Sequence, residues 1–205
     1  GDYDAVIITY EHFEKIPLSQ EAQTRYYQEQ VDQIIAAQEE AKKQQTGKNF
    51  TVKQLAKKRA ELEAKIKGLS DVARDEDNID FESLGVDSLF VDEAHNFKNL
   101  FYTTQMSDVA DLGNKKGSKR ASDLYMKVRY LQGLNGGRGV VFGTATPVMN
   151  SVVEMYAMQS YLQGDLRKQK GINSFDAWAS EFGEVVDINK MKAGGDGYET
   201  KQSMS

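Results

Sequence analysis

The chain has 205 residues, no cysteine, and a formal net charge of -5 from 26 basic and 31 acidic side chains. Without cysteine it has neither disulfides nor thiolate metal sites, which fits a reducing compartment, and we expect a cytoplasmic protein. No apolar run approaches the ~20 residues of a membrane span, so we expect no membrane partner. The apolar content of 40% suffices for a hydrophobic core, and the length allows one large or two small domains.

The N-terminal stretch predicts the first strand of a main α/β domain. Residues 5–9, AVIIT, are apolar and β-branched, as in a buried parallel strand. A short helical turn should follow at residues 10–15 and end at Pro17. We therefore assign residues 1–17 to the start of this domain.

Residues 18–78 have a different character and predict an antiparallel helical hairpin inserted into the main domain. Ser19 suits the N-cap of a long helix, because its hydroxyl can accept a free backbone N–H. A second helix should begin near Thr51, with Leu55, Leu62 and Leu69 at heptad spacing. Two functions remain open for the hairpin: packing alone, or contact with DNA or a protein partner.

The stretch SLFVDEAHNFKN at residues 88–99 is the centre of the functional prediction. Its apolar run, Leu89–Val91, reads as a buried strand, with Asp92, Glu93 and His95 directly after it. Open α/β sheets bind ligands at the carboxyl ends of their strands. There, one acid can hold Mg²⁺ through its water and the next can polarise an attacking water. The alternative is a plain helix start, with Asp92 as N-cap.

A second strand, Gly139–Gly143, leads into Thr144, Ala145, Thr146 and Pro147. Two strands that each end in a polar signature are less easily accidental than one, so the two signatures together favour a ligand site. We assign residues 79–190 to the remainder of the α/β domain and residues 191–205 to a mobile tail, where glycines replace the apolar pattern.

Three helices are expected within residues 79–190. One begins at Ser118 or Ser122 and ends before residues 135–137, NGG, with a buried apolar stripe. Asn150 or Ser151 should cap the next helix, at residues 152–162. The third, at residues 174–182, carries aromatic side chains at helical spacing.

Lysine and arginine gather in two segments although the chain is acidic overall. Phosphate contacts are mainly electrostatic, so these side chains are candidates for DNA contact. The alternative is an ordinary solvated helix face and a mobile loop. The candidates are Lys53, Lys57, Lys58, Lys115, Lys116, Lys119 and Arg120.

The DEAH sequence at residues 92–95 resembles motif II, the Walker B box, of superfamily 2 helicases, and GTATP at residues 143–147 resembles their motif III. The continuation VMNSVVE and the tail NFKN after motif II resemble the Swi/Snf-type branch. Residues 3–10, YDAVIITY, look like the strand before motif II. The whole resembles the helicase part of methyltransferase–helicase proteins carried by phages, plasmids and conjugative elements. Ala145 departs from the glycine usual in the Swi/Snf pattern.

This resemblance implies a partial RecA-like (P-loop NTPase) lobe of an ATP-dependent DNA helicase or translocase. In the parent protein, Asp92 would hold the water shell of Mg²⁺, Glu93 would activate the attacking water, and His95 would relay nucleotide state to motif III. Thr144 and Thr146, on either side of Ala145, would couple that state to movement on DNA. Asn150 and Glu154 would cap and brace the helix that follows.

The chain has no G-x-x-x-x-G-K-[ST] loop to cradle the phosphates of ATP. The resemblance therefore implies that it works with an N-terminal part and a second motor lobe of the same protein, on duplex DNA. Alone, it should not hydrolyse ATP efficiently. Two alternatives remain: a non-catalytic module that binds nucleic acid or a partner through the hairpin, and an RNA helicase.

Overall fold

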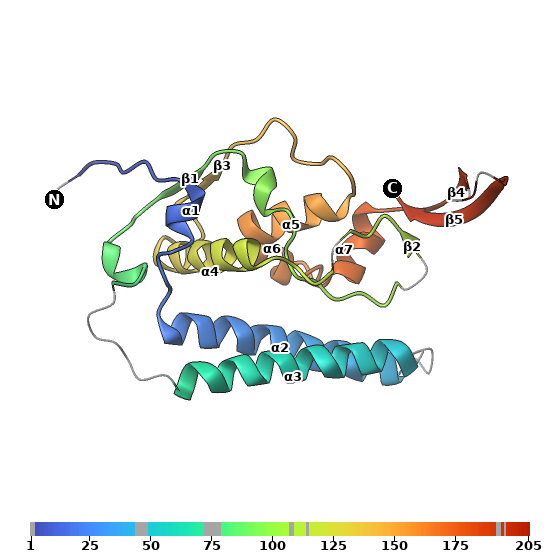
Figure 1. Cartoon of the computed structure of the whole chain (residues 1–205), viewed down its shortest axis with the longest axis horizontal. Helices are drawn as coiled ribbons and strands as arrows, with labels where there is room; N and C mark the ends of the chain where they lie inside the picture. Colours follow the sequence, from blue (N-terminus) through green and yellow to red (C-terminus); the bar gives the residue numbers. More distant parts are fainter. Residues whose placement is uncertain are drawn as a thin grey trace.

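The computed structural model describes residues 3–43, 49–71, 79–106, 109–113, 115–191, 194 and 196–205 (Figure 1). The α-helices are α1 (Tyr10–Phe13), α2 (Gln20–Lys43), α3 (Asn49–Asp71), α4 (Lys119–Leu134), α5 (Val153–Leu162), α6 (Gly164–Gln169) and α7 (Phe175–Phe182), and the 3-10 helices are η1 (Glu82–Leu84) and η2 (Ala94–Phe97). The strands are β1 (Leu89–Val91), β2 (Val109–Ala110), β3 (Val140–Phe142), β4 (Val185–Met191) and β5 (Tyr198–Met204). Among the helices of these ranges, none combines the length and apolar character needed to cross a membrane.

Strands β1 and β3 pair in parallel, with Leu89 opposite Val140 and Val91 opposite Phe142. One face of this pair packs on α4 and contributes to the main core. The other face is open, with Phe90 76% exposed. Because the two strands run in the same direction, their carboxyl ends lie at one edge. The predicted partial α/β lobe with parallel strands is confirmed.

Helix α4 lies at the centre of the molecule, between the β1–β3 pair and the long hairpin (Figure 1). It begins as predicted, because the Ser118 hydroxyl accepts the backbone N–H of Ala121 at 3.1 Å. The buried stripe of Leu124, Val128 and Leu131 faces the strands. This helix therefore fixes the strand ends relative to the hairpin.

The inserted hairpin consists of α2 and α3, which run antiparallel beside α4 (Figure 1). Ser19 is the predicted cap, since its hydroxyl accepts the N–H of Ala22 at 3.2 Å. The seam between the two helices is a small cluster of buried side chains: Val31, Ile34, Leu55 and Leu62. The turn predicted at residues 47–49 lies mostly outside the described residues.

The strand predicted at residues 5–9 is wrong for the structure. These residues form no strand, and Val6 and Ile7 are exposed. A strand requires a hydrogen-bonded neighbour, and the described part of the chain provides none here. The helical turn that follows is present as α1, whose Phe13 is buried in the main core.

The expectation of a mobile tail at residues 191–205 is also wrong for the part described. Strand β5 pairs antiparallel with β4 and parallel with β2. Met204 is buried against Trp178 and other aromatic side chains. Backbone pairing stabilises a strand whose own side chains are largely polar, which is why hydropathy alone missed it.

Candidate functional site

The two signatures meet at the carboxyl edge of the β1–β3 pair. The N–H of Gly143 donates to the carbonyl of Val91 at 2.8 Å, and the N–H of Ala94 donates to the carbonyl of Gly143 at 3.0 Å. These bonds continue the ladder past the end of each strand. The loop carrying Asp92 and Glu93 is thereby fixed beside the loop that begins at Gly143, as predicted from the sequence.

Glu93 adopts a left-handed backbone conformation, with φ 46° and ψ 46°. Its N–H donates to the Asp92 carboxylate at 2.9 Å, and only the four-residue 3-10 helix η2 follows. The plain helix start is therefore wrong, because no α-helix begins here. Such a conformation costs about 1–3 kcal/mol for a residue other than glycine, and such outliers concentrate at functional sites.

His95 connects the two motifs. Its Nδ1 lies 3.1 Å from Thr144 Oγ1 and 3.1 Å from Glu93 Oε2. The hydroxyl of Thr144 also accepts the backbone N–H of Thr146 at 3.2 Å. An unprotonated Nδ1 accepts from Thr144, whereas a protonated Nδ1 donates to Glu93. One nitrogen cannot accept and donate at the same time. His95 Nδ1 therefore has two alternative hydrogen bonds, one with Thr144 and one with Glu93.

A second connection joins the segment after motif II to the helix after motif III. The Lys98 ammonium lies 2.8 Å from the Glu154 carboxylate, which also accepts the N–H of Met149 at 2.6 Å and that of Asn150 at 3.3 Å. Burial opposes the charge of Glu154, but the Lys98 ammonium and these N–H donors hold its pKa below the ordinary value. The predicted bracing role of Glu154 is confirmed. The partner Lys98 was not predicted, because residues so far apart give no spacing signal.

Tyr10, the first residue of α1, lies close to the acidic pair. Its ring packs edge-on against Phe97 at 5.1 Å between centroids. Burial raises the pKa of Tyr10, and the carboxylates of Asp92 and Glu93 raise it further. The end of the N-terminal segment thus belongs to the surroundings of the site, although its residues form no strand.

The oxygen ligands at this edge suit Mg²⁺. Proteins commonly hold Mg²⁺ through one or two carboxylates, while water and substrate phosphates complete its octahedral shell. Asp92 and Glu93 are exposed, so they are accessible to such a hydrated ion. Within the described ranges, no three histidine, cysteine or acidic side chains gather to enclose a metal by themselves. The donor set therefore fits a metal that arrives with phosphate. Ala145 adds no polar group.

The structure separates the predicted DNA-contact residues. Lys58, Lys116 and Lys119 line one groove between the hairpin and the start of α4. Lys53 and Lys57 are exposed on α3. The remaining two are engaged elsewhere: Lys115 donates to the carbonyl of Met106 at 3.1 Å, and Arg120 pairs with Glu14.

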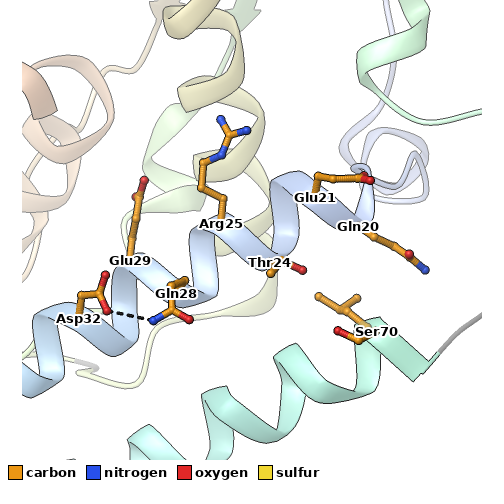
Figure 2. Close-up of a pocket in the computed structure, with 9 residues that line it drawn as sticks. Gln20, Glu21, Thr24, Arg25, Gln28, Glu29, Asp32 and Ser70 are labelled. Carbon is orange, nitrogen blue, oxygen red and sulfur yellow. Dashed lines mark hydrogen bonds between the residues drawn. The ribbon is translucent and has the colours of Figure 1, made fainter.

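Another hollow lies between the first turns of α2 and the end of α3, with a volume of about 650 Å³ (Figure 2). Figure 2 shows Glu21, Arg25 and Glu29 on α2, with Ser70 on the facing helix. Charges of both signs line it, and no residue of the two motifs does. It offers no consistent chemistry for a ligand.

Comparison with known proteins identifies related sequences. The model of a family described as "Probable helicase domain" matches residues 1–189. The "Defense against restriction protein B" of Escherichia phage P1 is 31% identical over 187 residues, which are 90% of this chain. The chain spans only 8% of the length of that protein. No solved structure matches.

Proposed function

The chain belongs to the family of probable helicase domains, and from this premise we propose that it is part of the ATP-dependent motor of a DNA helicase or translocase. Asp92 and Glu93 follow β1, and His95 links Glu93 to Thr144 after β3. This arrangement carries the proposal. Parallel strands that present acids and a hydroxyl at one edge have the arrangement that nucleotide-binding α/β proteins use.

We assign each side chain a role that agrees with its position. Bound Mg²⁺ neutralises charge on the phosphates of ATP. The Asp92 carboxylate would hold this ion through its water shell, and Glu93 would orient the attacking water and take its proton. When Glu93 engages that water, it weakens its contact with the His95 ring. His95 Nδ1 then contacts Thr144 alone. Through this contact, the motif III loop responds to whether ATP is bound.

Further parts of the same protein complete this motor in our proposal. Phe90 and Val141 are 76% and 51% exposed on the open face of the β1–β3 pair. Val6 and Ile7 are also exposed, although strands of this composition are usually buried. The much longer phage relative is consistent with a parent that supplies a preceding segment, with the phosphate-binding loop, and a second lobe. Duplex DNA is the proposed substrate.

The test is Glu93→Gln in the parent protein. ATP turnover should fall by about 10²–10⁴, the contribution of a general base, while ATP affinity stays within about threefold. Glu181→Gln, a matched change at an exposed position on α7, should leave turnover unchanged. A Glu93→Gln parent that hydrolyses ATP at the unmodified rate removes Glu93 from the mechanism.

A non-catalytic nucleic-acid-binding module is the second candidate, favoured by the lysine-lined groove at the hairpin. An ATPase-inactive parent that still binds nucleic acid through this groove would support it. An RNA helicase differs only in substrate. Stimulation of the parent's ATPase by duplex RNA but not by duplex DNA would identify that case.

A further inference from the structure

We propose that the groove between the hairpin and the start of α4 binds the sugar–phosphate backbone of a nucleic-acid strand. Members of both basic segments of the sequence, Lys58 and Lys65 from one and Lys116 and Lys119 from the other, meet in this groove. This proposal rests on the proposed function only in taking nucleic acid, rather than another polyanion, as the ligand. It adds the contact surface that the motor assignment lacks.

The groove has a volume of about 380 Å³ and walls from both parts of the molecule. Tyr27 and Leu62 line it from the hairpin, and Phe101 lines it from the main lobe. A hollow of this size is larger than one phosphate group and can take a backbone unit with its sugar. A ligand here touches the hairpin and the lobe at once.

Positive charge reaches the groove from several elements. Lys58 and Lys65 come from α3, Lys116 and Lys119 from around the start of α4, and Lys15 from the segment after α1. The lysines of α3 are thus brought opposite lysines that are distant in sequence. Such a two-sided array suits a chain of phosphates, whose contacts to lysine are mainly electrostatic.

The acidic side chains in the groove do not cancel this charge, because each is engaged with a cation outside the lysine array. Glu14 pairs with Arg120, and Asp123 lies 2.7 Å from the buried Lys127. Lys58 has a longer contact of 3.7 Å to Glu61 on the same helix. A pair at the surface, here with Glu61 exposed and Lys58 half-buried, is worth only about 0–1 kcal/mol, so a phosphate can replace it.

Aromatic rings position two of the ammonium groups. The Lys58 ammonium lies 5.3 Å from the centroid of the Phe101 ring, and that of Lys65 lies 5.2 Å from the Tyr27 ring. These are cation–π distances, and they hold both charges against an apolar floor.

The start of α4 adds the positive end of a 16-residue helix, capped by Ser118. Gly117 fixes this start close to Phe101: it has φ +73°, and a Cβ built on it would lie 2.7 Å from the Phe101 backbone nitrogen. The loop therefore brings the helix end close to Phe101, whose ring is contacted by Lys58 from the opposite wall of the groove.

The experiment measures binding of fluorescein-labelled 20-nucleotide strands, as single strands and duplexes of DNA and RNA, to the 205-residue chain by anisotropy without ATP. Lys58→Gln/Lys119→Gln removes one cation from each wall. If each contacts one phosphate, affinity falls about 25- to 60-fold at ~0.1 M salt, and the slope of log K against log salt becomes shallower by about 1.4–1.8. Lys168→Gln/Lys170→Gln, an equal charge change at exposed positions outside the groove, should change affinity less than about threefold.

Equal losses of affinity in the two double variants would overturn the proposal, and so would a chain that does not bind the strands. Polyglutamate that displaces the labelled strand as effectively as unlabelled oligonucleotide does would also overturn it. Circular dichroism checks that each variant is folded, and Lys65→Gln alone tests the same site with an exposed side chain. The binding assay contains no ATP, so its outcome does not depend on whether Glu93 acts as the general base. Failure of the ATPase proposal therefore leaves this result intact, and the reverse holds as well.

Discussion

Glu154→Gln tests whether the loops of motifs II and III are held together as the structure indicates. The Glu154 residue is only 7% exposed and accepts from the Lys98 ammonium and from two backbone N–H groups. Glutamine keeps the shape but removes the charge and turns an amide N–H₂ towards one of these donors. Since a hydrogen bond involving a charged group contributes about 1.5–3 kcal/mol, we expect a loss of about 2–4 kcal/mol in the free energy of unfolding.

Urea denaturation of the 205-residue chain measures this loss, with Glu181→Gln as the exposed control. A chain of this size loses about 2–4 °C in Tm per kcal/mol, so Tm should fall by about 4–16 °C. Lys98→Met and the double variant complete a cycle whose coupling should be about 1–3 kcal/mol. A Glu154→Gln chain within about 0.5 kcal/mol of the unmodified chain, or additive effects in the cycle, would refute the reasoning.

The pH dependence gives an independent check. The pKa of Glu154 is lowered in the folded chain, so its charge stabilises the fold above the ordinary value of 4.5 and this contribution is lost as the pH falls through the folded pKa. The difference between the unmodified and Glu154→Gln chains should therefore shrink on acidification below pH 4.5. A difference that stays constant down to pH 3 or grows would contradict this assignment.

Three further substitutions follow from particular contacts. Lys127 is 0% exposed and pairs with Asp123, so Lys127→Met should lower the unfolding free energy by about 3–5 kcal/mol. Adding Asp123→Asn should recover part of this loss. A loss below about 1 kcal/mol in urea denaturation would contradict the prediction. Gly117→Ala should cost at least about 1 kcal/mol in the same assay, because its Cβ meets the Phe101 backbone at 2.7 Å; an unchanged midpoint would count against it. Glu93→Gly should raise Tm by about 2–4 °C, because it relieves about 1 kcal/mol of backbone strain at φ 46°. The same change should abolish ATP turnover in the parent protein. A lower Tm would argue against strain at this residue.

The elements that the sequence predicted well are those whose pattern and burial agree. Leu89–Val91 and Val140–Phe142 are short apolar runs followed by polar signatures. They pair in parallel, and one face of the pair packs on α4. Ser19 and Ser118 cap their helices because the local chemistry of a hydroxyl and a free N–H is independent of the rest of the fold.

The wrong predictions at residues 5–9 and 191–205 have one physical cause: the local sequence does not show which segments pair as neighbouring strands. Residues 5–9 have strand composition but no neighbour among the described residues. Tyr198–Met204 is mostly polar, yet it pairs with β4 and buries Met204. The alternation of apolar and polar residues in VVDIN at 185–189 was a signal that could have predicted strand β4.

The candidate site divides in the same way. Spacing placed Asp92 and Thr144 at one edge, but it gave no indication of the left-handed Glu93 or of the contact between Lys98 and Glu154. The groove could not be predicted either, since Lys58 and Lys119 line one hollow only when the hairpin lies beside the main lobe. Side chains that act across elements require the tertiary structure.

The most direct measurement is a crystal structure of the parent protein with Mg²⁺, ADP and a metal fluoride that mimics the transferred phosphoryl group. The account predicts that a water of the Mg²⁺ shell contacts Asp92, and that the water in line for attack lies about 2.6–3.2 Å from Glu93. Nucleotide bound at any other edge of the molecule, with Asp92 and Glu93 facing only solvent, would contradict it.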